Sequence, residues 1–398
     1  MSIAVLIALL CGLFAVAYGV WAGRAIVAAP AGNERMQEIA RAPDAPILGA
    51  ATGKQRLTPI EVSYWLAAGA KEGRVEDAFA TLLTEVRRMR SFGVTESELN
   101  RARKRLQASY QTYYNEREKT ASSTHAGELV RVFTTGEAAP GVTAESKIAQ
   151  RFLQEIDVQE VNAFAAGWLP DAGRVVSVTM PEKEGLIPPT EEALAAVAQR
   201  VDALALVAPS ENASDRPLLA KKPTPGRITE RISHDALGVL EWRLSNGMRV
   251  FLKATDFKDD QVRVLAQSVG GTETASDATF PSARAALGIA ARSGLGEFDA
   301  LELRRLLAGR RVSASPTVSG NGEGVAGSSS KEDLETLFTL LHLQFTASRL
   351  DETGLRLFLE QSRESIRNRL KSPSTWFEDR YRELMWQGFA RFEPWTEE

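Results

Sequence analysis

Zinc sites are usually built from histidine and cysteine, which are scarce here: the chain has three histidines and one cysteine among 398 residues. His125, His234 and His342 lie far apart in the sequence, so no two of them share one face of a helix. Cys11 lies in an apolar run near the N-terminus. A catalytic zinc ion needs three protein ligands directed at one point and an open position for water. The sequence therefore predicts no catalytic residue, no cofactor-binding residue and no metal ligand.

One string comes close to a metal-binding motif. His125 and Glu128 have the spacing His-x-x-Glu on a predicted helix, but Leu129 follows where a second imidazole is needed. Two ligands hold zinc weakly, so we interpret His125 as a helix-face histidine with an ordinary partner. We expect His342, within LFTLLHLQF, to pack beside core residues, and His234 to be solvated. A Ser/His/Asp triad stays open because its members can be far apart, although no nucleophile-elbow pattern accompanies a histidine.

Composition and charge narrow the class of protein. A hydrophobic share of 44% and a charged share of 25% are typical of globular chains, and the length suits about two or three domains. A net charge of −3 with mixed signs argues against nucleic acid as a partner. We interpret the basic run Arg101 to Arg105 as a solvated helix surface. The Gly- and Ser-rich segment from Val318 to Ser330 lacks the Gly-Lys-Ser/Thr ending of a phosphate loop and is predicted to form a hairpin.

Residues 3–22, IAVLIALLCGLFAVAYGVWA, contain no charged side chain. As a helix this run would be about 30 Å long, the thickness of the hydrocarbon core of a bilayer. Tyr18 and Trp21 stand where interfacial aromatic residues are common, and Arg24 follows. We therefore predict a transmembrane helix and a single-pass membrane location, with the globular part either periplasmic or cytoplasmic. A cleaved signal peptide and a buried soluble helix are the alternatives, and the lack of Lys or Arg before the run disfavours the signal peptide.

The same region resembles a membrane family. The strings CGLFAVAYGVWAGRAIVA and AGNERMQEIA, from about Leu6 to Ala40, resemble the opening of the membrane-bound proton-pumping pyrophosphatases. This resemblance implies a pump of many helices whose acidic loops hold magnesium pyrophosphate. No such loops follow residue 40, so the pump activity is not carried over, while the resemblance favours an uncleaved span.

From residue 33 onward, periodicity predicts helices and strands in alternation. In the first half the expected helices are 33–41, 74–91, 95–118, 121–134, 145–156, 158–168 and 190–204, and the expected strands are 61–70 and 174–180. Thr95 and Glu98 form a predicted capping box, and the proline-rich stretch 205–235 is interpreted as a linker. In the second half we expect a two-residue turn at Asn246-Gly247. The other expected elements there are strands 239–244, 248–253, 262–269, 311–318 and 322–328 and helices 281–293, 299–309, 331–347, 351–371 and 374–386.

Several strings, in order, resemble the pitrilysin/insulinase-type zinc metallopeptidases. They include AKEGRVEDAFATLLTEVRRMRSFGVTESELNRARKRL in the first half, and EWRLSNGMRVFLKATDFKDDQV and ASDATFPSARAALGIAARSGLGEF in the second. The resemblance covers nearly everything from residue 33 to about residue 385. It implies an α+β fold of repeated units, each an antiparallel sheet with helices packed on one face, assembled into a clamshell.

The resemblance also implies a division of the chain. Residues 1–32 are then an N-terminal membrane helix and its flank, 33–204 a partial unit ending the first half-shell, 205–235 a linker, and 236–398 a partial unit starting the second half-shell. The unit expected before residue 33 carries His-x-x-Glu-His and a downstream glutamate as zinc ligands. The corresponding slot of the second half-shell, Ala285 to Ile289, has neither histidine nor glutamate. The distal Arg/Tyr pair of the family would follow Glu398.

Three hypotheses about function result. The first is a non-catalytic member or fragment of this family, which binds an extended peptide along a sheet edge or is the partner of an active zinc-bearing peptidase subunit. An uncovered sheet edge also predicts poor solubility without a partner. The second is a chimeric or truncated reading frame, joined near NERMQEIA, with no function of its own. The third is a metallopeptidase with an unrecognised site, for which His125 is the candidate ligand to probe.

Overall fold

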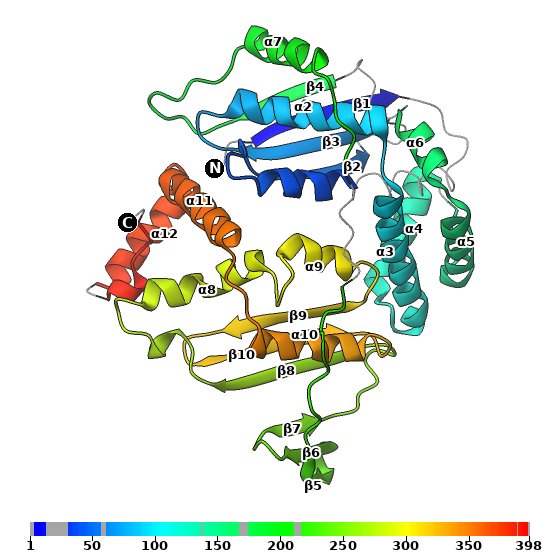
Figure 1. The fold of residues 1–398 in the computed structure, drawn as a ribbon, viewed down its shortest axis with the longest axis vertical. Coiled ribbons are helices and arrows are strands. Elements are labelled where there is room, and N and C mark those ends of the chain that lie inside the picture. Colours follow the sequence, from blue (N-terminus) through cyan, green and yellow to red (C-terminus); the bar gives the residue numbers. More distant parts are fainter. Residues whose placement is uncertain are drawn as a thin grey trace.

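A computed structural model describes residues 4–12, 31–56, 61–136, 138–166, 174–210, 216–387 and 389–396. These residues form two units of helices and antiparallel strands, and a separate small sheet lies at one end of the molecule (Figure 1). The mixed α and β class with antiparallel sheets agrees with the prediction from the sequence.

The first unit is built on a four-stranded antiparallel sheet in the order β2-β3-β1-β4. The strands are β1 (Ala4–Gly12), β2 (Ile47–Arg56), β3 (Glu61–Ala70) and β4 (Arg174–Thr179). Along β3, alternate side chains from Tyr64 to Ala70 are buried, as expected of a strand with one covered face. Sequence periodicity does not predict β2, because ILGAATGKQR has no regular alternation of apolar and polar residues.

Strand β1 overturns the predicted membrane helix. Residues 4–12 pair with β3 along their whole length, and residues 4–9 also pair with β4, so β1 is a central strand. A continuous apolar run is typical both of a fully covered strand and of a buried or membrane helix, and periodicity does not separate them. The predicted transmembrane helix and single-pass membrane location are therefore wrong, as is the pump-like helix that the pyrophosphatase likeness implied. Residues 13–22 lie outside the described residues.

The membrane prediction receives no support from the helices either. Within the described parts of the chain, every helix is too short or too polar to cross a bilayer.

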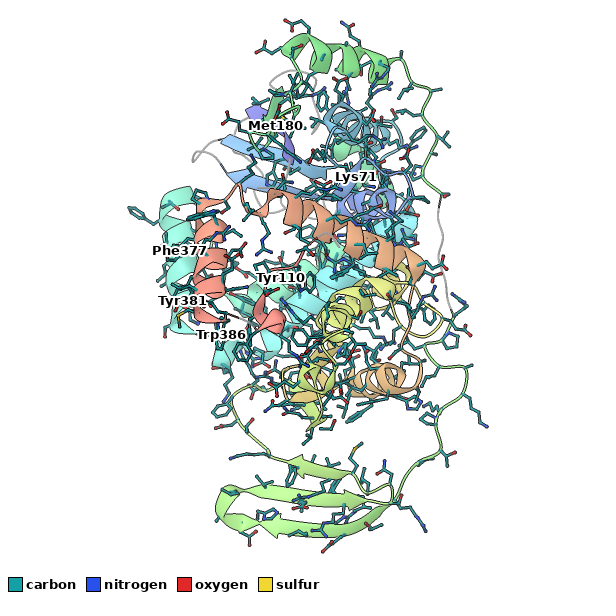
Figure 2. All side chains as sticks on the ribbon, turned by 90° about the vertical axis from the view of Figure 1, so that its left-hand side faces the viewer. Lys71, Tyr110, Met180, Phe377, Tyr381 and Trp386 are labelled. Atoms are coloured by element: carbon teal, nitrogen blue, oxygen red, sulfur yellow. The ribbon has the colours of Figure 1, made fainter. Side chains whose placement is uncertain are left out.

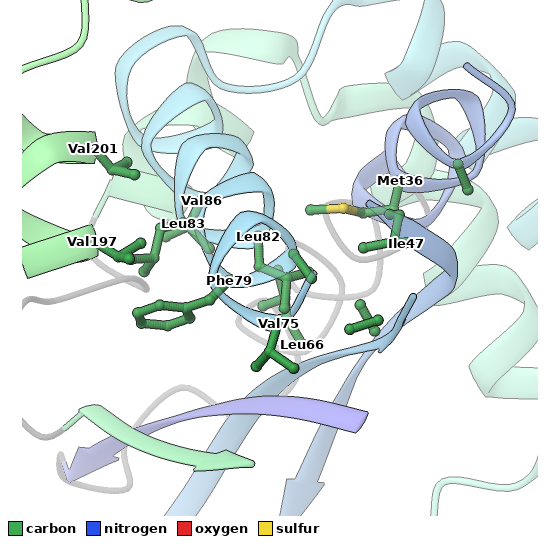
Figure 3. Packing of buried hydrophobic residues seen from close by; sticks show 14 of the residues in the cluster. Met36, Ile47, Leu66, Val75, Phe79, Leu82, Leu83, Val86, Val197 and Val201 are labelled. Carbon is green, nitrogen blue, oxygen red and sulfur yellow. The ribbon is translucent and has the colours of Figure 1, made fainter. Parts of the chain in front are cut away.

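Helix α2 (Val75–Phe92) packs on one face of the first sheet, with α7 (Glu191–Asp202) and the helical residues 31–40 beside it. Phe79 and Leu82 of α2 are at most 2% exposed, and Met36 and Ile47 close the same core (Figure 3). Burying each of these side chains contributes about 1.5–3 kcal/mol. The apolar stripe predicted for residues 74–91 therefore holds the unit together.

Helix α3 (Glu96–Asn115) begins at the predicted capping box. The Thr95 hydroxyl accepts the Glu98 N–H, and the Glu98 carboxylate accepts the Thr95 N–H at 2.8 Å. Leu99 and Ala102 of this helix form a second small core with Val161. The helices that follow are α4 (Ser122–Thr135), α5 (Val142–Glu155) and α6 (Val158–Ala166), close to the predicted ranges.

A buried charge network joins α2 and α3 to residues 31–40. The Nε and Nη2 groups of Arg35 each donate to a carboxylate oxygen of Glu98 at 2.7 Å, and Nη1 donates to Glu85 at 3.2 Å. All three side chains are at most 8% exposed. Burial by itself raises the pKa of Glu98, but the hydrogen bonds and charge of Arg35 outweigh burial and hold that pKa below its ordinary value.

The second unit is built on a three-stranded antiparallel sheet in the order β8-β10-β9. Helix α10 (Leu334–Thr346) covers one face, where Val325 and Leu337 are buried against the half-buried Val264 and Ala266. The strands are β8 (Val262–Val269), β9 (Val312–Val318) and β10 (Gly322–Ser329). The other helices of the unit are α8 (Phe280–Ser293), α9 (Ala300–Leu306), α11 (Glu352–Arg369) and α12 (Pro373–Met385). The hairpin predicted within 318–330 is confirmed at β9 and β10.

Strands β5 (Ile228–His234), β6 (Val239–Leu244) and β7 (Arg249–Leu252) form the separate sheet. β5 lies within the stretch interpreted as a linker, because ITERISH has almost no apolar alternation. The predicted two-residue turn is wrong. The Leu244 N–H donates to the Met248 carbonyl, so the loop has three residues, and Gly247 supplies the positive φ of 86° that such a loop needs.

The two units meet mainly through charged side chains. Arg41, which follows the first helix, lies 3.2 Å from Asp351 at the start of α11. Lys71, at the end of β3, lies 3.1 Å from Glu360 in the middle of α11. The Gln361 side-chain amide also donates to a backbone carbonyl of β2 at 2.9 Å. Helix α11 therefore belongs to the second unit and also holds that unit against the first sheet (Figure 1).

Candidate functional site

Helix α4 carries the string that comes closest to a metal-binding motif. His125 Nδ1 and Glu128 Oε2 lie 4.0 Å apart, and 54% and 21% of these side chains are exposed. Leu129, at the position where a second imidazole is needed, is 68% exposed. The pair is a surface contact on one helix.

The other two histidines lie in the second half of the chain. His234 ends β5, and its Nε2 is 2.9 Å from Glu241 Oε2, so it is paired as well as partly solvated. Glu241 of β6 also accepts a hydrogen bond from Arg249 at 2.8 Å. The bonds from Arg249 and then His234 lower the pKa of the buried Glu241 carboxyl to about 2. His342 is half-buried on α10, between two buried leucines in the sequence.

Helix α8 contains the slot where the family resemblance places the counterpart of the zinc motif. The residues from Ala285 to Ile289 carry no side chain that binds metal. Gly288 packs against α11, because a methyl group added there would lie 2.5 Å from the ring of Phe358. Helix packing therefore fills the slot, and its residues do not fit a zinc ion. Among all the described residues, no group of three or more His, Cys, Asp and Glu side chains is placed to hold a metal ion.

The sheet of the second unit has an open edge at β8. The N–H of Gly270, just after β8, donates to the carbonyl of Asn321 at 3.3 Å. This bond shows which residues of β8 direct their backbone N–H and C=O toward β10. Because backbone groups alternate sides in an antiparallel ladder, even-numbered residues of β8 face β10. The N–H and C=O of Leu265, Gln267 and Val269 therefore point away from β10. Within the described chain, no strand pairs with that side of β8.

The side chains along this edge are also accessible. Leu265 is 70% exposed and Val269 95% exposed, on the face of the sheet opposite α10. The alternation in VRVLAQSV predicts a strand with one covered face, but nothing in the sequence indicates that the outer edge lacks a neighbour. Sequence reasoning therefore identifies the strand and misses the edge.

Two other sheet edges are blocked, at β9 and at β2. At the free edge of β9, Pro316 has no N–H to offer, and proline at an edge prevents further pairing. At the free edge of β2, the Asn33 side chain accepts the Thr52 N–H at 2.8 Å and donates to the Thr52 carbonyl at 3.3 Å. β4, at the opposite edge of the first sheet, has six residues against eight in β8. β8 therefore offers the longer accessible edge.

Comparison with known proteins gives relatives of one kind. No family model matches the chain. The chain is 27% identical over 315 residues to the zinc protease PQQL-like of Arabidopsis thaliana, a match that covers 78% of this chain and 30% of that protein. It is 21% identical over 279 residues to the probable zinc protease PqqL of Haemophilus influenzae, which covers 68% of this chain and 29% of that protein. The chain thus spans less than a third of the length of these curated relatives.

The fold has a counterpart among solved structures. A variant of the ferredoxin protease FusC, solved in complex with Arabidopsis ferredoxin, superposes with a TM-score of 0.61 at 18% identity. The match covers all of this chain and 44% of that chain. The two sequence relatives and the shared fold lead to one conclusion: this chain is related to the pitrilysin/insulinase-type zinc metallopeptidases.

Proposed function

We propose that this chain is a non-catalytic part of an insulinase-type peptidase and binds an extended peptide along the free edge of β8. The observation that carries the proposal is the row of outward-facing backbone groups at Leu265, Gln267 and Val269. An added peptide strand gains main-chain hydrogen bonds from such an edge, and alternate side chains give specificity.

The chemistry of the edge favours an extended peptide with apolar residues at alternate positions. Leu265 and Val269 project from the same face of β8 and are more than two-thirds exposed. A peptide strand at this edge would place its own side chains beside them at the spacing of neighbouring strands, about 4.7–4.9 Å. Arg263, on the same face, favours an acidic residue in the peptide.

A proline substitution at the edge tests the proposal directly. Gln267→Pro removes one outward N–H without removing a bond of the β8–β10 ladder. We expect the affinity of the full chain for a labelled peptide of alternating apolar and polar residues to fall roughly twofold to tenfold, the value of about one net hydrogen bond. Fluorescence anisotropy measures this affinity.

The matched control is Gln267→Ala, which keeps the backbone N–H and changes only the side chain. The proposal requires the alanine variant to bind like the unchanged chain. Equal losses in the two variants, with circular dichroism spectra unchanged, would assign the effect to the side chain and refute edge pairing. No binding by the unchanged chain would refute the proposed function itself.

A second candidate function is that of partner to a zinc-bearing peptidase subunit. It is favoured by exposed apolar side chains along α12 and at its C-terminal end, where Phe377, Tyr381 and Trp386 are 64%, 54% and 45% exposed (Figure 2). Contiguous exposed apolar surface of this kind marks protein contacts. The test mixes the chain with a separately produced insulinase-type unit that carries His-x-x-Glu-His, and follows complex formation by light scattering.

Phe377→Asp is the matched variant for this second candidate, because its side chain is solvated and the fold tolerates a charge there. Loss of the complex in this variant supports docking through α12. A complex that persists unchanged, or the absence of any complex with the unchanged chain, excludes it.

A further inference from the structure

A hollow of about 540 Å³ lies among α8, α11, α12 and the C-terminal segment, away from the β8 edge. Its wall includes four arginines, at positions 284, 292, 369 and 382, and two glutamates, at positions 364 and 393. The aromatic side chains of Phe358 and Trp395 meet edge to face on the same wall, with ring centroids 6.3 Å apart. The hollow is therefore cationic with a flat apolar side.

Two of the four arginines already have partners within the protein. Arg369 pairs with Asp379 and donates to the Trp395 carbonyl. Arg292 donates to the Gln361 side-chain oxygen at 2.5 Å and to a carbonyl of its own helix. These two side chains build the wall and are not available to a ligand.

The other two arginines have no carboxylate partner among the described residues. The Arg284 guanidinium lies over the Trp395 ring, 4.9 Å from its centroid. Burial, and then the charge of Arg382, lower the pKa of Arg284 below its ordinary value, as expected of like charges that face one another. Of the glutamates on the wall, Glu364 lies 3.8 Å from Arg367, and Glu393 is exposed.

Two polar atoms behind the wall are buried without partners. Asn368 is 3% exposed, and its Oδ1 accepts no hydrogen bond, while its Nδ2 donates to the Glu364 carbonyl at 3.0 Å. The Trp395 Nε1–H is likewise buried and donates to nothing. Both atoms are enclosed by neighbouring side chains, which leaves Arg284, Arg382 and the ring of Phe358 as the groups that can meet a ligand in the hollow.

We propose that this hollow binds the C-terminal carboxylate of a peptide. Arg284 and Arg382 pair with the carboxylate. The side chain of the last residue lies against Phe358. Inorganic phosphate supplies the negative charge but has no apolar group for the ring of Phe358, so a cationic wall beside a flat apolar side favours a peptide end.

This inference rests on the proposed peptide-binding function and names the part of the peptide that is recognised. The test compares two peptides of one sequence, one with a free carboxylate and one with a C-terminal carboxamide, by fluorescence anisotropy on the full chain. Because hydrogen bonds between charged groups are stronger than neutral ones, we expect the carboxamide to bind about tenfold or more weakly.

Two variants on one helix locate the effect. Arg382→Gln removes an arginine of the hollow and should abolish the preference for the free carboxylate. Arg380→Gln is the matched control, because Arg380 is a solvated arginine of α12 that pairs with Glu383 and lies outside the hollow. The preference should survive in it.

The outcomes separate the two proposals. Equal binding of both peptides overturns the carboxylate site and leaves edge binding at β8 in place. If neither peptide binds, the edge proposal fails, and calorimetric titration with N-acetyl-phenylalanine and with its amide decides the hollow alone. Equal behaviour of those two compounds, or competition by inorganic phosphate as strong as that of the acid, overturns the assignment to a peptide end.

Discussion

Replacing Arg35 by methionine is expected to destabilise the first unit by about 3–5 kcal/mol at pH 7, the cost of leaving buried charges without their partner. Arg35 donates to both oxygens of Glu98, to Glu85 and to the Gly93 carbonyl. Methionine keeps the apolar stem but removes all of these bonds. The carboxylates of Glu85 and Glu98, 2% and 8% exposed, then lose their main cationic partner.

Urea unfolding of the full chain, followed by circular dichroism, measures this loss. The matched control is Arg88→Met, because Arg88 touches Glu85 at 3.4 Å with 35% of its side chain exposed, and such a pair contributes at most about 1 kcal/mol. The reasoning fails if the Arg35 variant stays within about 1 kcal/mol of the unchanged chain.

The same pair of proteins gives a pH test of the network. In the unchanged chain the pKa of Glu98 is below the ordinary pKa of a glutamate. The Glu98 carboxylate therefore stabilises the fold at any pH above that ordinary pKa, and this stabilisation is lost as the pH falls through the pKa of Glu98 in the folded chain. In the Arg35→Met variant, burial is no longer offset by the bonds and charge of Arg35, so the pKa of Glu98 rises and protonation relieves the variant as the pH falls. The difference in stability between the two proteins should therefore shrink from pH 7 toward pH 4, and a constant difference would contradict the account.

Three further predictions concern the core, the separate sheet and the first strand. Leu82→Ala should cost about 2–5 kcal/mol in urea unfolding, because Leu82 is fully buried on the face of α2 that packs against the first sheet. A cost below about 1 kcal/mol would contradict its place in the core. The sheet β5-β6-β7 should lose stability as the pH falls from 4.5, the ordinary pKa of a glutamate, toward about 2, the pKa of Glu241 in the folded chain, because protonation removes the charge that pairs with Arg249 and His234. Amide exchange in β6 measures this loss, and Glu241→Gln should remove the pH dependence. Amides of β1 should exchange slowly, and Ile7→Pro should cost about 1–3 kcal/mol, because proline removes a ladder hydrogen bond from a central strand and leaves its acceptor unpaired. Rapid exchange in the unchanged chain would argue against the pairing.

The helices follow from the sequence because their signals are local. The stripe in 74–91 and the capping box at Thr95 and Glu98 predict α2 and the start of α3 nearly residue by residue. β1 could not be predicted in the same way, because its apolar run suits a membrane helix equally well, and pairing with residues far along the chain decides between the two. β2, rich in Gly and Ala, shows no period and is formed only beside β3.

The candidate sites follow from the sequence even less. The sequence alone shows that the three histidines cannot share one face of a helix, because about a hundred residues or more separate His125, His234 and His342 from one another. The open edge of β8 depends on which strands do not pair with it, and the hollow beside Trp395 collects side chains from three helices and a terminal segment. Arg284 and Arg382 have no local pattern that marks them, because their role depends on the three helices that bring them to one hollow.

The place of β1 in the first sheet has a consequence for the order in which that sheet assembles. Its two neighbours come from distant parts of the chain, since Ala4 is paired with Gly69 on one side and with Thr179 on the other. Closing so long a loop costs entropy before any hydrogen bond between the paired strands can form, so the sheet is completed late. Until β4 arrives, one side of AVLIALLCG has no neighbouring strand, and such an apolar segment aggregates readily during refolding. Dilute refolding, or a chaperone that shields the segment, should therefore raise the yield of the folded chain.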